Sequence, residues 1–210
     1  MNHVAFGTFF GFPAYGSTAL RWSPGYLVGA SWLLFAAYWL VTAIGAKAAS
    51  KVEKASERIG HIVLMLVGFV ALYDSAPRGL DWLNRRFVPE ESWIMWLGAY
   101  VVLAGVLFAI WARRTIGKEW SAEVQIKEGH QLIRSGPYAH IRHPIYTGIL
   151  IAIAGTALAI GEYRGLVGLG IITLGFVLKA KKEETFLAAQ FGPAFEEHRR
   201  HTGFFLPRFA

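Results

Sequence analysis

Titratable and aromatic side chains gather in a short segment in the second half of the chain, directly before a long apolar run. Residues 136–148 contain a Gly-Pro turn and four side chains of chemical interest, Tyr138, Arg142, His143 and Tyr146. Arginine donates paired hydrogen bonds to anions, histidine changes its charge near neutral pH, and tyrosine offers a ring face that attracts cations. The segment therefore places titratable chemistry beside an apolar element.

A second polar cluster follows the next apolar run. It supplies acids and bases of its own: Lys179, Glu183, Glu184, His198 and His201. Only residues 162–164 separate the two apolar runs, so the runs must form an antiparallel hairpin. Both polar clusters are then at the same end of that hairpin.

The composition predicts an all-helical integral membrane protein. Hydrophobic residues make up 54% of the 210 residues, which favours a membrane-embedded chain over a soluble one. Charged residues divide the chain into five uncharged intervals, which we interpret as about five transmembrane helices: 26–46, 59–73, 92–112, 143–161 and 165–178. Three intervals have the length of a bilayer helix, whereas the second and the fifth, with about 15 residues each, are short of the usual length of about 20.

The distribution of positive charge predicts the orientation in the membrane. If the N-terminus is outside, only five of the 21 Lys and Arg residues remain on the outer side, as the positive-inside rule requires. These five are Arg21, Arg78, Arg85, Arg86 and Arg164. Because the basic residues lie between apolar segments and not along one soluble face, the net charge of +7 indicates membrane topology and not a nucleic-acid partner. The C-terminus and both polar clusters are then cytoplasmic.

Small residues line both arms of the predicted hairpin. They are Gly148, Ala152, Gly155 and Ala159 on the first arm, and Gly165, Gly168 and Gly175 on the second. Small side chains let two helix backbones approach closely in a membrane. We expect the two stripes to face one another.

Apolar residues continue at helical spacing after the hairpin, at Phe186, Leu187, Phe191 and Phe195, among many charged residues. This spacing predicts an amphipathic helix. Such a helix can lie on the lipid headgroups, or it can fold back over the loop before Pro144. The second arrangement would close a pocket on the cytoplasmic side.

The order of these motifs resembles the isoprenylcysteine carboxyl methyltransferase family, together with related membrane methyltransferases that act on phospholipids and small thiols. The resemblance runs from about Gly117 to Phe209, and the first three helices share only their hydrophobic character with the family. Its motifs are Trp120-Ser121, Glu128-Gly129-His130, Gly136-Pro137-Tyr138, Arg142-His143-Pro144-x-Tyr146-x-Gly148, Glu183-Glu184-x-x-Leu187 and Phe191-Gly192. It implies one membrane domain over residues 1–210, with a three-helix part over 1–113 and a catalytic part over 114–210.

The resemblance implies S-adenosylmethionine as the methyl donor, with S-adenosylhomocysteine as its product. That cofactor carries a carboxylate, an ammonium, a sulfonium and an adenine, so its site needs donors, an acid and aromatic faces. We expect Arg142 and His143 to hold the carboxylate and Glu184 to hold the ammonium. Tyr138 or Tyr146 is then available to the sulfonium or the adenine.

The reacting end of the acceptor is assigned to Lys179 and Glu183 by the same resemblance. Family members usually have an arginine at the first of these positions, and lysine keeps the charge without the planar fork that grips a carboxylate. The family's tail tyrosines are replaced by Phe195 and His198. We expect a lipophilic or prenylated acceptor and carboxyl O-methylation, with phospholipid N-methylation or thiol S-methylation as alternatives.

Three other classes of protein stay open. A membrane metalloenzyme could use two HxxH pairs, His140 with His143 and His198 with His201, together with a glutamate. We nevertheless predict no metal ligand. A nicotinamide-dependent reductase lacks a glycine fingerprint, and a non-catalytic lipid-binding protein would need no chemistry. The chain has no cysteine, which excludes disulfides, thiolate metal sites and a cysteine nucleophile.

Overall fold

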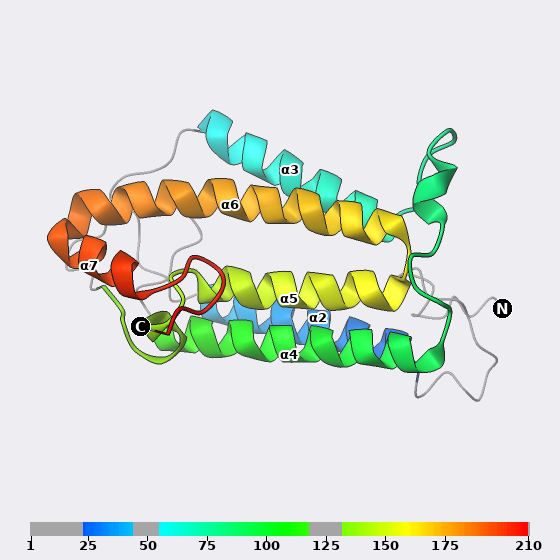
Figure 1. Ribbon diagram of the computed structural model, residues 1–210, viewed down its shortest axis with the longest axis horizontal. Coiled ribbons are helices and arrows are strands. Elements are labelled where there is room, and N and C mark those ends of the chain that lie inside the picture. Colours follow the sequence, from blue (N-terminus) through cyan, green and yellow to red (C-terminus); the bar gives the residue numbers. More distant parts are fainter. Residues whose placement is uncertain (1–22, 44–54, 118–131, 210) are drawn as a thin grey trace.

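The regular structure is helical throughout the part of the chain that the computed structural model describes, residues 23–43, 55–117 and 132–209. Five helices correspond to the five predicted apolar intervals: α2 (Pro24–Ala43), α3 (Ala55–Tyr73), α4 (Ser92–Ile116), α5 (Pro144–Ile160) and α6 (Tyr163–Phe191). A short α7 (Pro193–His201) and two 3-10 turns, η2 (Asp81–Asn84) and η4 (Gly136–Ala139), complete the fold (Figure 1). The motifs Trp120-Ser121 and Glu128-Gly129-His130 lie outside the described residues.

Three of the described helices are long and apolar enough to cross a membrane, by length and composition: α2, α4 and α6. The two hairpin arms differ in length from the uncharged intervals. The first arm is the shorter one, because Pro144 begins α5 and Gly161, with φ of 75°, ends it after 17 residues. The second arm continues past its apolar part as one helix of 29 residues, since no proline occurs in it before Pro193 and the helix ends at Gly192, where φ is 50°.

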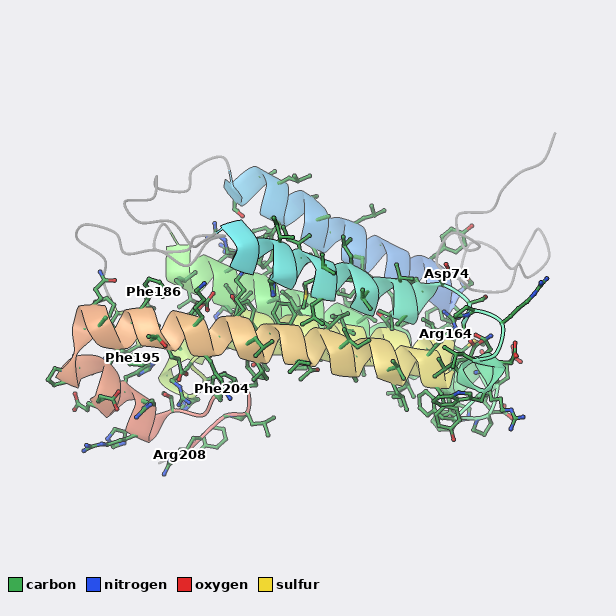
Figure 2. All side chains as sticks on the ribbon, turned by 90° about the horizontal axis from the view of Figure 1, so that it is seen from above. Asp74, Arg164, Phe186, Phe195, Phe204 and Arg208 are labelled. Atoms are coloured by element: carbon green, nitrogen blue, oxygen red, sulfur yellow. The ribbon has the colours of Figure 1, made fainter. Side chains whose placement is uncertain are left out.

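The helices pack as an elongated bundle in which α4 and α5 lie side by side, α2 packs against α4, and α3 packs against α6 (Figure 1). The buried core between them consists of apolar side chains from all five helices, including Val28, Leu72, Val102, Ile153 and Ile172. Figure 2 shows Asp74 and Arg164 at one end of the bundle and Phe195, Phe204 and Arg208 at the other. We call the second end the site end.

Glycines fix the closest helix pair, and it is not the pair that the sequence predicted. At Gly98 and Gly105 of α4, and at Gly148 and Gly155 of α5, a Cβ atom would lie 2.5 to 2.6 Å from a backbone nitrogen of the other helix. The stripe of α5 therefore faces α4, which carries a matching stripe. Of the three glycines on the second arm, only Gly165 faces α5, whereas Gly168 and Gly175 contact α3.

The end of the bundle opposite the site is closed by the connection between α3 and α4. Phe87 N donates to Gly161 O at 2.9 Å, and Arg86 Nη1 donates to Ile160 O at 3.1 Å, so this connection caps the C-terminus of α5. Arg164 Nη1 donates to Leu72 O at 2.9 Å and caps α3. These two arginines, predicted only as outer charges, hold the ends of the helices together.

Candidate active site at the polar end of the hairpin

Arg142 and His143 converge on one carboxylate oxygen. Arg142 Nε donates to Glu184 Oε1 at 2.6 Å, and His143 Nε2 lies 3.1 Å from the same oxygen. His143 is the residue before α5, and Glu184 lies on the part of α6 that extends beyond its apolar stretch. The antiparallel hairpin thus brings the two predicted clusters together and builds a pair of donors that binds a carboxylate.

Glu183 joins the same chain of polar contacts. Tyr146 Oη donates to Glu183 Oε1 at 2.5 Å, and His143 Nδ1 lies 3.5 Å from Glu183 Oε2. Both ring nitrogens of His143 therefore face carboxylates. Burial lowers the pKa of His143, but hydrogen bonds to the two glutamates and their negative charges outweigh it, so the net pKa is raised and the imidazolium form is favoured.

This raised pKa predicts a pH-dependent stability. A histidine with a raised pKa contributes its full stabilisation below about pH 6.5, its unfolded value, and loses it as the pH rises through the folded value. We expect the melting temperature of the ligand-free protein in detergent to fall between about pH 6 and about pH 9 by more than that of a His143→Gln variant. Equal slopes for the two proteins would show that His143 does not carry this charge.

Lys179 lies one helical turn before Glu183 on α6, over the ring of Tyr146. Its Nζ atom is 5.9 Å from the Tyr146 ring centroid, and the same ring stacks on Phe176 at a centroid distance of 4.7 Å. Phe176 was not predicted as a site residue. Its spacing from Lys179 and Glu183, three and seven residues, is typical of one helix face and could have indicated it.

The tail after α7 returns to the segment before Pro144, as one of the two predicted arrangements requires. Arg142 N donates to Gly203 O at 2.9 Å, Gly203 N donates to His140 O at 2.9 Å, and Thr147 Oγ1 donates to Phe205 O at 2.8 Å. The apolar residues expected in one amphipathic helix are divided, because Gly192 separates the end of α6 from α7. That the tail closes a cofactor pocket stays a prediction.

Two tail phenylalanines, neither of them predicted as a site residue, pack on the polar chain. The Phe204 ring lies 5.0 Å from the His143 ring and 5.6 Å from the Arg142 guanidinium carbon. The Phe205 ring meets His143 and Tyr146 edge to face at 6.1 and 6.4 Å. The tail therefore fixes the orientation of both rings.

Tyr138 lies apart from this hydrogen-bonded chain. Its side chain is buried in an apolar cluster with Ala112 and Ile145. Burial raises the pKa of the Tyr138 hydroxyl, and the negative charge of Glu183 raises it further. Its predicted contact with the sulfonium or the adenine stays a prediction.

The predicted histidine pairs do not act as units. The His140 ring packs on Phe209 at 5.0 Å, whereas His143 turns to the two glutamates. Burial lowers the pKa of His198, and the positive charges of Arg134 and Arg142 lower it further. Among the residues that the structure describes, no three His, Asp or Glu side chains are grouped to hold a metal ion.

Fold and site define a helical integral membrane protein with an acid–base site at one end of its bundle. Residues 96–189 match the sequence model of the Isoprenylcysteine carboxyl methyltransferase (ICMT) family. The resemblance to this family, predicted from the order of the motifs, is confirmed over that segment.

The chain is also similar to individual relatives and, in its fold, to a solved structure. The chain is 32% identical to the cobalt-zinc-cadmium resistance protein CzcN of Cupriavidus metallidurans over 118 residues, 54% of this chain and 52% of that protein. It is 30% identical to a probable protein-S-isoprenylcysteine O-methyltransferase of Oryza sativa over 120 residues, 54% of this chain and 63% of that protein. The chain thus spans about half the length of the first relative and less than two thirds of the length of the second. The fold is similar to that of the eukaryotic intramembrane Ras methyltransferase ICMT, with a TM-score of 0.57, 19% identity, and coverage of 89% of this chain and 67% of that one.

Proposed function

We propose that the protein is an S-adenosylmethionine-dependent methyltransferase that acts on a lipophilic acceptor at the inner face of the membrane, with carboxyl O-methylation of an isoprenylcysteine as its reaction. One observation carries the proposal. The segment that matches the family contains Arg142 and His143, which converge on Glu184 at 2.6 and 3.1 Å at the boundary of an apolar hairpin. A site with both charges next to apolar helices suits a polar cofactor and an apolar acceptor.

The residues present fit the amino-acid part of S-adenosylmethionine. Arg142 and His143 already form a carboxylate-binding pair, because they share one oxygen of Glu184. In the proposed complex they hold the carboxylate of the cofactor, and Glu184 accepts from its ammonium. The rings of Phe204 and Tyr146 lie beside His143, at 5.0 and 5.8 Å.

The cofactor, when bound, supplies a methyl group on a positively charged sulfur. Lys179 and Glu183 are proposed to orient the reacting group of the acceptor, with Tyr146 fixing Glu183 through its hydroxyl. Packing of the tail on His143 and Tyr146 limits the access of water, which favours a reaction that brings an anion and a cation together into neutral products. Positioning of the two reactants supplies much of the remaining acceleration.

The proposed membrane arrangement follows from the charge distribution. We propose a single membrane domain over residues 1–210 that crosses the bilayer five times, with the N-terminus outside and the C-terminus cytoplasmic. The site end of the bundle is then at the cytoplasmic face. A soluble cofactor reaches it from water, while the acceptor stays in the lipid.

Methylation of a thiol or an amine is a second candidate, which the lysine at position 179 favours. An ammonium group is a point charge and does not offer the two parallel donors that a carboxylate accepts. The product distinguishes the two: a methyl ester releases methanol in alkali, whereas a methyl thioether or methylamine does not. We expect base-labile label on a prenylcysteine incubated with labelled cofactor.

Calorimetric titration with S-adenosylhomocysteine tests the cofactor site. We expect saturable binding to the wild-type protein in detergent and at least about 100-fold weaker binding to an Arg142→Ala, His143→Ala double variant, since two charged hydrogen bonds are lost. Arg134→Ala is the matched control. Both arginines donate to backbone oxygens of α7, Arg142 to Arg199 O at 3.2 Å and Arg134 to Ala194 O at 2.5 Å. The side chain of Arg134 pairs with Glu197 and not with Glu184. No binding by folded wild-type protein would overturn the proposed function.

A further inference from the structure

Helix α3 carries a histidine inside its apolar stretch that is not among the predicted site residues. His61 lies in the interval 59–73, which contains no Lys, Arg, Asp or Glu. Ionisable side chains are rare within membrane helices and usually mark functional positions. The side chain is partly buried, while its neighbour Ile62 is 47% exposed.

The packing of α3 on α6 determines where His61 lies. Near the middle of the pair, an added Cβ at Gly68 would lie 2.5 Å from Ile172. One turn closer to the site end, Met65 packs on Gly175 of α6. One further turn brings the His61 ring to 6.4 Å from the ring of Phe176. His61 therefore lies at the level of α6 where Lys179 begins the polar cluster.

Through Phe176, His61 is part of a continuous row of rings. The centroid distances are 6.4 Å from His61 to Phe176, 4.7 Å from Phe176 to Tyr146, 5.8 Å from Tyr146 to His143 and 5.0 Å from His143 to Phe204. The row joins α3, α6, α5 and the tail. The residues proposed for the cofactor lie at the tail end of this row, so His61 marks the other end.

Two basic side chains lie against the stacked pair of Phe176 and Tyr146 in the middle of the row. His61 contacts Phe176, and the Lys179 Nζ atom lies 5.9 Å from the Tyr146 ring. A lysine alone offers a single point of charge. A second donor from α3 would give an anionic group two points of attachment, because either neutral tautomer of imidazole keeps one N–H.

We propose that His61 is an acceptor-binding residue, which with Lys179 holds the anionic reacting group of a lipophilic acceptor lying along Phe176 and Tyr146. The proposal rests on the proposed methyltransferase function and deepens it. The apolar part of such an acceptor would lie against α3, whose outward face is rich in exposed aliphatic side chains: Ile59, Ile62, Val63, Leu66, Val67 and Val70.

Equilibrium binding of radiolabelled N-acetyl-S-farnesylcysteine to protein saturated with S-adenosylhomocysteine tests this role without turnover. We expect His61→Phe, which keeps a ring against Phe176 but removes the N–H, to bind the probe about tenfold more weakly. His61→Gln, which keeps a donor, should stay within about threefold of wild type. Leu107→Phe is the control, at an exposed position of α4 outside the proposed acceptor site, and should bind like wild type.

The affinity for S-adenosylhomocysteine distinguishes failure of the proposed role of His61 from failure of the proposed methyltransferase function. It should be the same in all four proteins, because His61 lies at the opposite end of the ring row from Arg142. If wild type binds S-adenosylhomocysteine and the probe, and His61→Phe binds the probe equally well, the role of His61 is wrong and the proposed function stands. Wild type that binds S-adenosylhomocysteine but not the probe overturns the prenylcysteine acceptor and the role of His61 together. Wild type that binds neither overturns the methyltransferase function itself.

Discussion

Replacing Glu183 with glutamine is expected to lower turnover by about 100-fold to about 1,000-fold and to leave the affinity for S-adenosylhomocysteine within about threefold of wild type. The Glu183 carboxylate accepts from Tyr146 Oη at 2.5 Å and lies 3.5 Å from His143 Nδ1. Glutamine keeps the size and an acceptor for Tyr146 but removes the charge that faces Lys179. The measurements are single-turnover methylation of a prenylcysteine and calorimetric titration.

Glu184→Gln provides the matched comparison, because the two glutamates are neighbours on one helix and share His143. Glu184 carries the contacts to Arg142 at 2.6 Å and to His143 at 3.1 Å, so its neutralisation should weaken S-adenosylhomocysteine binding about 10-fold to about 100-fold. The opposite pattern, with binding lost in Glu183→Gln and kept in Glu184→Gln, would exchange the roles of the two carboxylates. Equal losses in both variants would mean that they form one cofactor site.

The polar chain of the site could be predicted because covalent connectivity nearly dictates it. Only residues 162–164 join the two arms, so an antiparallel hairpin must bring Arg142 and His143 near Glu183 and Glu184. The period of the α-helix then places Lys179 and Glu183 on one face. These inferences need no knowledge of how other helices pack.

The aromatic surroundings of the site could not be predicted in the same way. Phe204 and Phe205 reach His143 only because Gly192 reverses the chain after α6 and the tail pairs with residues 140–143. A glycine indicates that a turn is possible but does not give its direction. His61 illustrates a different limit, since its position depends on packing between α3 and α6, which are far apart in sequence.

The prediction that the α5 stripe packs on α6 was wrong for a related reason. Short connections favour contact between sequence neighbours, so the stripe from Gly148 to Ala159 was paired with α6. Close approach, however, requires small residues on both helices at matching intervals. Gly98 and Gly105 of α4 have the seven-residue spacing of Gly148 and Gly155, and this match decides the partner.

The α4–α5 seam predicts the largest loss of stability in the molecule. A Cβ at Gly105 would lie 2.5 Å from Ala152 N and 2.6 Å from Gly148 O, and backbone atoms cannot move aside as a flexible side chain can. We expect Gly105→Val to separate the two helices and to lower the free energy of unfolding, measured by titration with denaturing detergent, by about 3 kcal/mol or more.

Gly170→Val is the control, because a Cβ at Gly170 would meet nothing within 4 Å and valine is a better helix former than glycine. The site would fail with the seam, since His143 directly precedes the helix that α4 holds, so S-adenosylhomocysteine binding should be lost in Gly105→Val and kept in Gly170→Val. Equal stability of the two variants would show that the helices do not approach as closely as the glycines indicate.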